Sequence, residues 1–348
     1  MSRPGFVLEV DERTPPLLFH HGEGFRLEKL PLGTRVVYPP EALTGIRDVD
    51  AAIDRALEEP RGSEPLDALL RPGMRLTIAV DDISLPLPPM RTPDIRGRVI
   101  EHVHERAARA GVDDVRITMA NSLHRRMTPR EIKRAVGERV YRSFWPDALT
   151  NHDAEDRANL VEIGTTDHGE VVEIGRRAAE SDLLVYVNIN LVAMDGGHKS
   201  VPVGLGSYRS LRHHHNVHTM LRSRSYMDPP ASALHDSTAR MGRLLAEHLK
   251  IFTVETTLNN DTFPKPFDFL QKREWEWSVA DQAAYLAAKR ATDRAPASIN
   301  RKVFHRIAAP FGITGVTAGE TEAVHEVTLE RVHRQQIVEV DGQADVLV

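Results

Sequence analysis

Three short runs of the chain are almost entirely apolar, and a fourth is rich in β-branched residues. The apolar runs largely lack the alternation of polar and apolar positions that marks a half-exposed strand. They therefore predict buried strands of the kind found in parallel sheets, and the β-branched run predicts a further strand. The four runs lie at 76–81, 115–120, 183–187 and 251–258.

Segments with helical spacing lie between or after these runs. In 92–110 apolar residues recur every three or four positions, and Gly111 ends the pattern. Thr128, Pro129 and Glu131 combine a threonine N-cap, a proline at the first helical position and the glutamate of a capping box. Three more helices are expected, at 236–249, 278–291 and 320–334. The alternation predicts an α/β fold, with a parallel-sheet N-terminal domain and flanking helices.

The length of 348 residues corresponds to roughly two domains. A segment rich in Asn, Asp and Pro at 259–268 and the sequence RAPAS at 294–298 interrupt the alternation. We expect a first domain at 1–265. Linker helices and the beginning of a second α/β domain are expected at 266–348, including short apolar runs at 337–340 and 345–348.

Composition excludes several classes of site and partner. The chain has no cysteine, which excludes disulfides, thiolate metal sites, iron–sulfur ligation and a cysteine nucleophile, whereas it has 17 histidines. The net charge of −5 offers no basic field for nucleic acid, so no nucleic-acid partner is expected. There is no apolar run of membrane-spanning length and no export signal near the start, which predicts a cytoplasmic protein without a membrane partner.

Polar residues that could take part in catalysis or ligand binding follow the first three predicted strands. Ligands of open α/β sheets bind at the carboxyl ends of the strands, so these loops are expected to converge on one cleft. Each loop also has a plain structural interpretation, as a turn cap, an exposed histidine or a solvated lysine. The residues concerned are Asp82 and Ser84 after the first strand, His124 after the second, and Gly196, Gly197 and Lys199 after the third.

Four histidines fall within six residues at 213–218. In a helix His214 and His218 would share a face, and in an extended segment His213 and His215 would do so. Neither pair belongs to an HExxH motif. Metal ligation and a polar loop with stacked imidazole rings both remain open interpretations.

Taken together and in order, these segments resemble the nickel-pincer lactate racemase family, over roughly residues 30–260. That family has a loop Asp-x-Thr-Arg-Pro, then Gly-x-His-Arg-x-Met-Thr, Gly-Gly-x-Lys and a His-Asn pair. The corresponding segments are Asp82-Ile83-Ser84-Leu85-Pro86, Ser122-Leu123-His124-Arg125-Arg126-Met127-Thr128, Gly196-Gly197-His198-Lys199 and His215-Asn216.

The resemblance implies an isomerase, a racemase or epimerase that moves a hydride reversibly between a 2-hydroxy acid and a nickel-pincer nucleotide. This cofactor is a pyridinium ring with thioamide and thiocarboxylate arms, held covalently by a lysine and supplied by cofactor-synthesis enzymes. Lys199 would carry it, His215 would complete the nickel coordination and His124 would act as acid and base on the substrate hydroxyl. Asp82, Ser84, Gly196 and Gly197 would belong to the cofactor-binding loops.

Two departures from the family pattern bear on the substrate and the reaction. Leu85 replaces the family's arginine, so lactate itself is not expected as the substrate. The stretch 188–194 lacks the family's second acid/base histidine, for which His198 is a weak substitute because neighbouring side chains point apart. Two alternatives stay open: a noncatalytic relative that binds nickel or the cofactor, and a metal hydrolase built on the histidine cluster.

Overall fold

A six-stranded sheet forms the centre of the molecule, in the order β12-β11-β10-β5-β6-β7. The computed structural model describes residues 4–83, 89–342, 344 and 346. Neighbouring strands are parallel except for β12, which runs antiparallel to β11. The strands are β5 (Arg75–Asp81), β6 (Asp114–Ala120), β7 (Leu149–Asn151), β10 (Leu183–Asn190), β11 (Ile251–Leu258) and β12 (Ile313–Gly319). This arrangement confirms the expected α/β class.

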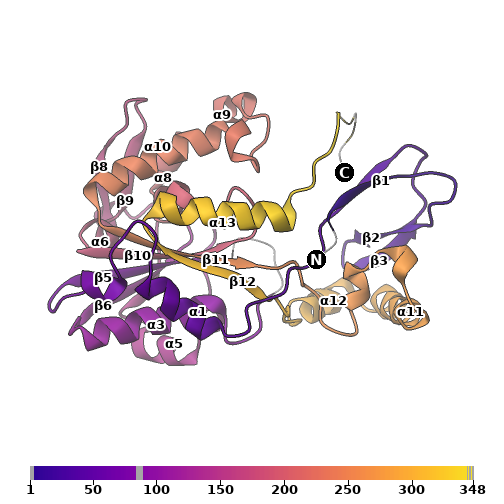
Figure 1. Cartoon of the computed structure of the whole chain (residues 1–348), viewed down its shortest axis with the longest axis horizontal. Helices are drawn as coiled ribbons and strands as arrows, with labels where there is room; N and C mark the ends of the chain where they lie inside the picture. The colour runs from indigo at the N-terminus through magenta and orange to yellow at the C-terminus, as the bar shows by residue number, and fades with distance from the viewer. Residues whose placement is uncertain (1–3, 84–88, 343, 345, 347–348) are drawn as a thin grey trace.

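Helices cover both faces of the sheet (Figure 1). On one face lie α1 (Val49–Glu58) and α3 (Ile95–Arg109), and on the other lie α10 (Ala233–His248) and α13 (Thr321–Gln336). The remaining helices are α2 (Leu66–Leu69), α4 (Pro129–Val136), α5 (Glu138–Phe144), α6 (Arg176–Ala179), α7 (Ser200–Gly204), α8 (Tyr208–Leu211), α9 (Val217–Arg222), α11 (Val279–Arg294) and α12 (Ala297–Phe304). No helix in the described residues has the length and apolar character needed to span a bilayer.

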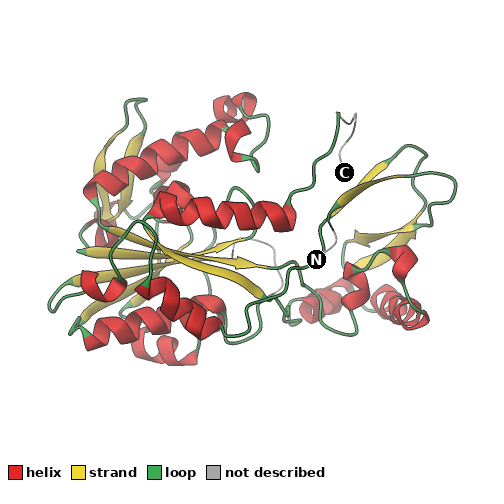
Figure 2. Cartoon of the chain, in the orientation of Figure 1, coloured by secondary structure: helices red, strands yellow, loops and turns green. Residues whose placement is uncertain are grey.

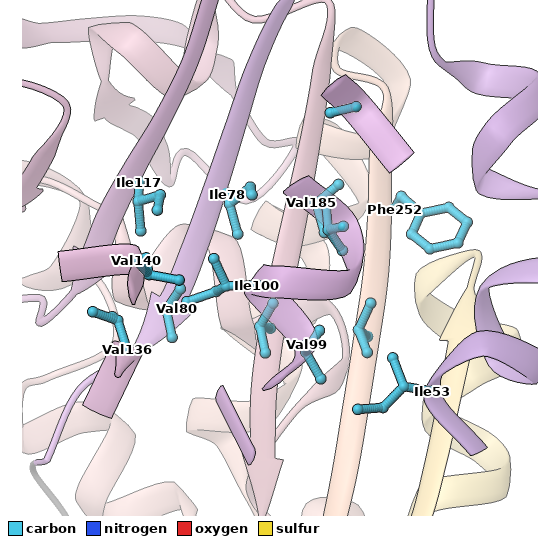
Figure 3. Packing of buried hydrophobic residues seen from close by; sticks show 14 of the residues in the cluster. Ile53, Ile78, Val80, Val99, Ile100, Ile117, Val136, Val140, Val185 and Phe252 are labelled. Carbon is cyan, nitrogen blue, oxygen red and sulfur yellow. The ribbon is translucent and has the colours of Figure 1, made fainter. Parts of the chain in front are cut away.

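The two faces of the sheet have separate hydrophobic cores. Ile78 and Val80 pack with Val99 of α3 on the first face (Figure 3). On the second face a smaller cluster includes Met241 of α10. Side chains alternate along a strand, so Asp81 points to the same face as α10 and α13. The second face therefore carries both apolar packing and the polar residues at the strand ends.

A peripheral unit, formed by residues 6–38 and 263–304, packs beside the main sheet (Figure 2). Strand β1 (Phe6–Glu9) pairs with β4 (Arg35–Tyr38), and β2 (Leu17–His21) pairs with β3 (Gly24–Glu28). Its small core joins Phe25 of β3 to Phe269 and to Tyr285 of α11. The segment 266–348 is thus shared between this unit and the main sheet, and the boundary at 265 stays a prediction.

Most of the elements predicted from apolar patterns are present, and the elements that were not predicted include α1, β12 and the half-buried hairpins. The four predicted strands correspond to β5, β6, β10 and β11, and the predicted helices to α3, α4, α10, α11 and α13. The hairpin of β8 (Leu160–Thr165) and β9 (Val171–Gly175) was not predicted. The apolar run at 337–340 forms no strand, and Ile337 and Val340 are 48% and 41% exposed, so the run is not the buried strand that its apolar residues suggest. The run at 345–348 lies largely outside the described residues.

Candidate active site

The sheet has a switch point between β5 and β10. After β5 the chain crosses to β6 on one side, whereas β10 pairs with β5 on the other side. Loops leaving the carboxyl ends of such strands diverge and leave room for a ligand. A cavity of about 380 Å³ lies at this point. Its polar lining includes Asp81, Asp82, Ser122, His124, Lys199 and His215, so residues from all three predicted loops meet in one place.

The end of β5 is held by a buried arginine. The Arg96 guanidinium of α3 donates to the backbone carbonyls of Asp81 and Asp82 at 3.1 and 2.8 Å, and pairs with Asp94 at 2.8 Å. The Asp81 carboxylate accepts a hydrogen bond from the backbone N–H of Ile189 in β10 at 2.8 Å. Burial raises the pKa of Asp81 to about 7. These contacts fix the two strand ends relative to each other.

His124 is oriented by Asp82. Its Nδ1 lies 3.0 Å from Oδ2 of Asp82, whose side chain is only 7% exposed, whereas the imidazole is 52% exposed. The hydrogen bond to this carboxylate raises the pKa of His124 above its ordinary value. An imidazole held in this way can take up or release a proton while it stays in contact with solvent. Ser84 and Leu85, which the sequence also singles out, lie outside the described residues.

The turn that carries His124 contains a strained residue. Ser122 has a φ of +51°, a conformation that favours glycine, and it is buried. Its N–H donates to the carbonyl of Gly204 at 3.1 Å, and the N–H of His124 donates to the carbonyl of Asn121 at 2.8 Å. The conformation is thus held by backbone bonds on both sides of the turn. It also explains why a glycine suits this position of the motif.

Lys199 reaches the cavity from a short 3-10 turn, Gly197–Lys199, and both its first residue and the preceding Gly196 have positive φ. The φ values are +80° at Gly196 and +65° at Gly197, which side chains other than glycine rarely adopt. Lys199 is half-buried, and no group in the described residues forms an ion pair or hydrogen bond with its ammonium. The amine is therefore available to a ligand in the cavity.

The histidine segment is only partly helical. Asn216 caps α9 by accepting from the N–H of Thr219 at 3.1 Å, which leaves His213, His214 and His215 ahead of the helix. Nδ1 of His215 lies 2.8 Å from Nδ1 of His214, and burial lowers the pKa of His214 to about 3. His215 is the member of the segment that lines the cavity. The described residues contain no group of three His, Asp or Glu side chains arranged to hold a metal ion.

His198 turns away from the cavity. Its Nε2 lies 3.4 Å from the carboxylate of Glu322 on α13, and it is not among the cavity-lining residues. The geometry gives it no contact with a ligand at Lys199. Its suggested role as a second acid/base group is therefore not supported.

Comparison with known proteins gives a consistent family. The model of the lactate racemase N-terminal domain matches residues 24–228, more than half of the chain. The chain belongs to the lactate racemase family. Two curated lactate racemases, from Lactiplantibacillus plantarum and Thermoanaerobacterium thermosaccharolyticum, are each 28% identical to it, over 170 and 167 residues. These matches span 47% of this chain, but only 38% and 37% of the two relatives.

The lactate racemase fold extends over most of the chain. The apoprotein structure of the T. thermosaccharolyticum lactate racemase superposes with a TM-score of 0.61 at 18% identity, covering 92% of this chain and 62% of that one. Structural likeness therefore reaches beyond the segment that the family model matches.

Three residues that contact the site loops were missed by sequence reasoning. Arg96 could not be singled out because it is one of several charged residues in a predicted amphipathic helix. Glu255 and His325 contact the lysine loop from β11 and α13, far along the chain. Glu255 left a signal, since it is the one charged residue within the run IFTVETTL. His325 left none, because a histidine in an amphipathic helix is unremarkable.

Proposed function

We propose that this protein is a racemase- or epimerase-type isomerase that acts on a 2-hydroxy acid with a nickel-pincer nucleotide bound to Lys199. The observation that carries this proposal is the convergence of Lys199, His215 and His124 on one cavity, from three separate loops. Membership of the lactate racemase family supplies the reaction class. The chain covers only part of the length of its curated relatives, so activity, substrate and partners are all part of the proposal.

The residues around the cavity fit such a cofactor. The Lys199 amine has no partner in the described residues and lines the cavity, as a covalent attachment point requires. The contact of His215 with His214 uses Nδ1, so Nε2 is the nitrogen that would be offered to a metal. With no cysteine in the chain, sulfur ligands for nickel would come from the cofactor. When bound, the cofactor supplies the acceptor for a hydride from the substrate.

The chain's own residues would manage the proton of the substrate hydroxyl. His124 accepts this proton as the Cα–H bond breaks and returns it when the bond reforms. Asp82 holds the imidazole in place and favours its protonated form. Apolar side chains, including Leu191 and Met194, form part of the cavity lining beside these polar groups.

Mass spectrometry and nickel analysis test the attachment. Protein produced together with cofactor-synthesis enzymes should show a covalent mass increase on Lys199 and bound nickel. Lys199→Ala should lack the mass increase, whereas the matched variant Lys250→Ala, at an exposed lysine, should retain it. His215→Ala should keep the mass increase and lose nickel. An unmodified wild-type protein without nickel would overturn the proposal.

A noncatalytic relative that binds the cofactor is the second candidate. The observation in its favour is the stretch 188–194, where the family has a second histidine and this chain presents Leu191 and Met194 to the cavity. Chiral chromatography of a panel of 2-hydroxy acids separates the two candidates. Interconversion of any one acid by the modified protein supports the enzyme, and its absence throughout the panel supports the binding protein.

A further inference from the structure

A carboxylate outside the cavity is buried behind the lysine loop. Glu255 lies in β11, and its side chain is 0% exposed. It is not among the described residues that line the cavity, so it is not placed to touch a ligand there. A carboxylate in such surroundings is costly unless several donors satisfy it. Its partners therefore identify what it holds.

Three donors surround this carboxylate, and two of them belong to the segment that carries the lysine. Oε1 accepts from the backbone N–H of Gly197 at 2.7 Å, and Oε2 accepts from Nδ2 of Asn190 at 3.1 Å. Nδ1 of His325, on α13, lies 3.3 Å from Oε2 and completes the set. Asn190 in turn donates to the carbonyl of Asp195 at 3.1 Å. One side chain thus connects both ends of the loop to the sheet and to α13.

The two glycines make this close approach possible. A Cβ at Gly196 would collide with Nδ2 of Asn190 and Oε1 of Glu255, and a Cβ at Gly197 would lie 2.8 Å from the His325 ring. On the α10 side of the loop, the missing side chain of Gly242 leaves room for the backbone carbonyl of His198. The loop is therefore enclosed between α10, α13 and β11, and its backbone packs closely against them.

We propose that Glu255 is a positioning residue that, together with His325, holds the Gly196-Gly197-His198-Lys199 loop so that the lysine amine enters the cavity at a fixed place. This inference rests on the proposed function for what the amine carries, but the holding of the loop is independent of any cofactor. Glu255 and His325 both lie outside residues 24–228, so the family's N-terminal segment depends on later parts of the chain for its lysine.

Hydrogen exchange and amine labelling of the full chain without cofactor test the holding of the loop. Glu255→Ala leaves the Gly197 N–H without an acceptor, and its exchange should accelerate by about tenfold or more. Labelling of Lys199 by an acylating reagent should rise toward the rate of the exposed Lys250. Glu255→Gln keeps an acceptor for Gly197 but loses one for the other donors, so it should fall between the wild type and Glu255→Ala.

Two further variants separate positioning from general stability. His325→Ala should accelerate the same exchange by a smaller factor, and it keeps the test available if Glu255→Ala does not fold. Asp281→Ala removes a partly buried ion pair with Lys272 in the peripheral unit, so it should lower the melting temperature without changing Gly197 exchange or Lys199 labelling. Unchanged exchange and labelling in folded Glu255→Ala and His325→Ala would overturn the inference.

The extent of cofactor attachment distinguishes this inference from the proposed function. With cofactor-synthesis enzymes present, Glu255→Ala should carry less of the mass increase on Lys199 than the wild type, with partial recovery in Glu255→Gln. If the wild type carries no mass increase, the proposed function fails, and the exchange result still decides the role of Glu255. If the wild type and Glu255→Ala are modified equally, the positioning role fails and the proposed function stands.

Discussion

The loops that carry Lys199 and His124 leave the same edge of the sheet but are held in different ways. The lysine loop is enclosed by two helices and a strand and is bound to a carboxylate that is 0% exposed. The His124 imidazole is 52% exposed, and among the described residues Asp82 orients it. A fixed attachment point benefits from rigidity, whereas an acid/base group must exchange its proton with solvent between turnovers. The difference in burial therefore matches the different tasks proposed for the two residues.

The largest effect is expected from removing the imidazole. His124→Ala should lower kcat/KM for the active 2-hydroxy acid by about 10²- to 10⁴-fold, because the other described imidazole that lines the cavity, His215, is the proposed nickel ligand. The mass increase on Lys199 should remain, since His124 is not part of the lysine loop. His218→Ala, at an exposed histidine that does not line the cavity, is the matched control and should stay close to wild type. Loss of the mass increase in His124→Ala would contradict the assignment of cofactor attachment to the lysine loop and proton transfer to His124.

A shift of the pH profile is expected when the partner of His124 is changed. The neutral imidazole acts as the base, so kcat/KM falls as the pH drops through the pKa of His124. Asp82 raises this pKa, and Asp82→Asn should therefore move the acid limb of the profile to lower pH. Asp153→Asn, which removes a carboxylate paired with Arg126 on the same side of the molecule, should leave the limb in place. An acid limb that does not move in Asp82→Asn would show that another group controls it.

The smallest effect is expected from relieving strain in the turn before His124. A side chain in the left-handed region costs about 1–2 kcal/mol. Replacing it with glycine removes this strain, but part of the gain is lost because glycine has greater freedom in the unfolded chain. Ser122→Gly should raise the free energy of unfolding by about 0.5 kcal/mol, measured by denaturant titration. Ser122→Ala retains the Cβ and should bring no such gain. A lower stability of Ser122→Gly would mean that the serine hydroxyl stabilises the fold by more than the backbone strain destabilises it.

Much of the main sheet could be predicted from sequence because its strands are buried on both faces. The runs that form β5, β6 and β10 are apolar almost throughout, so nearly every residue in them indicates a buried position. The hairpin β2–β3, with the sequences LLFHH and GFRLE, is only partly buried and gives no such signal. Its place depends on contacts with α11, which lies more than 200 residues away in the chain, and no local pattern records that.

In the candidate site, too, the residues in local motifs could be predicted and those brought in by distant segments could not. Asp82, His124 and Lys199 could be named because each follows a recognisable strand, and the structure brings all three to one cavity. The groups that hold them could not be named in advance. Glu255 meets the lysine loop only through the pairing of β10 with β11, and His325 only through the packing of α13. Motifs report the residues that meet a ligand, whereas the supporting residues depend on tertiary structure.

The contact between His325 and Glu255 sets an order of events during protein synthesis. Lys199 emerges from the ribosome well before residue 325, and chains fold progressively from the N-terminus as they are made. Until α13 has been translated and has packed on the sheet, the glycine loop lacks one wall of its enclosure. A nascent chain that already contains every matched motif would therefore still present an unfinished lysine site until α13 has joined it.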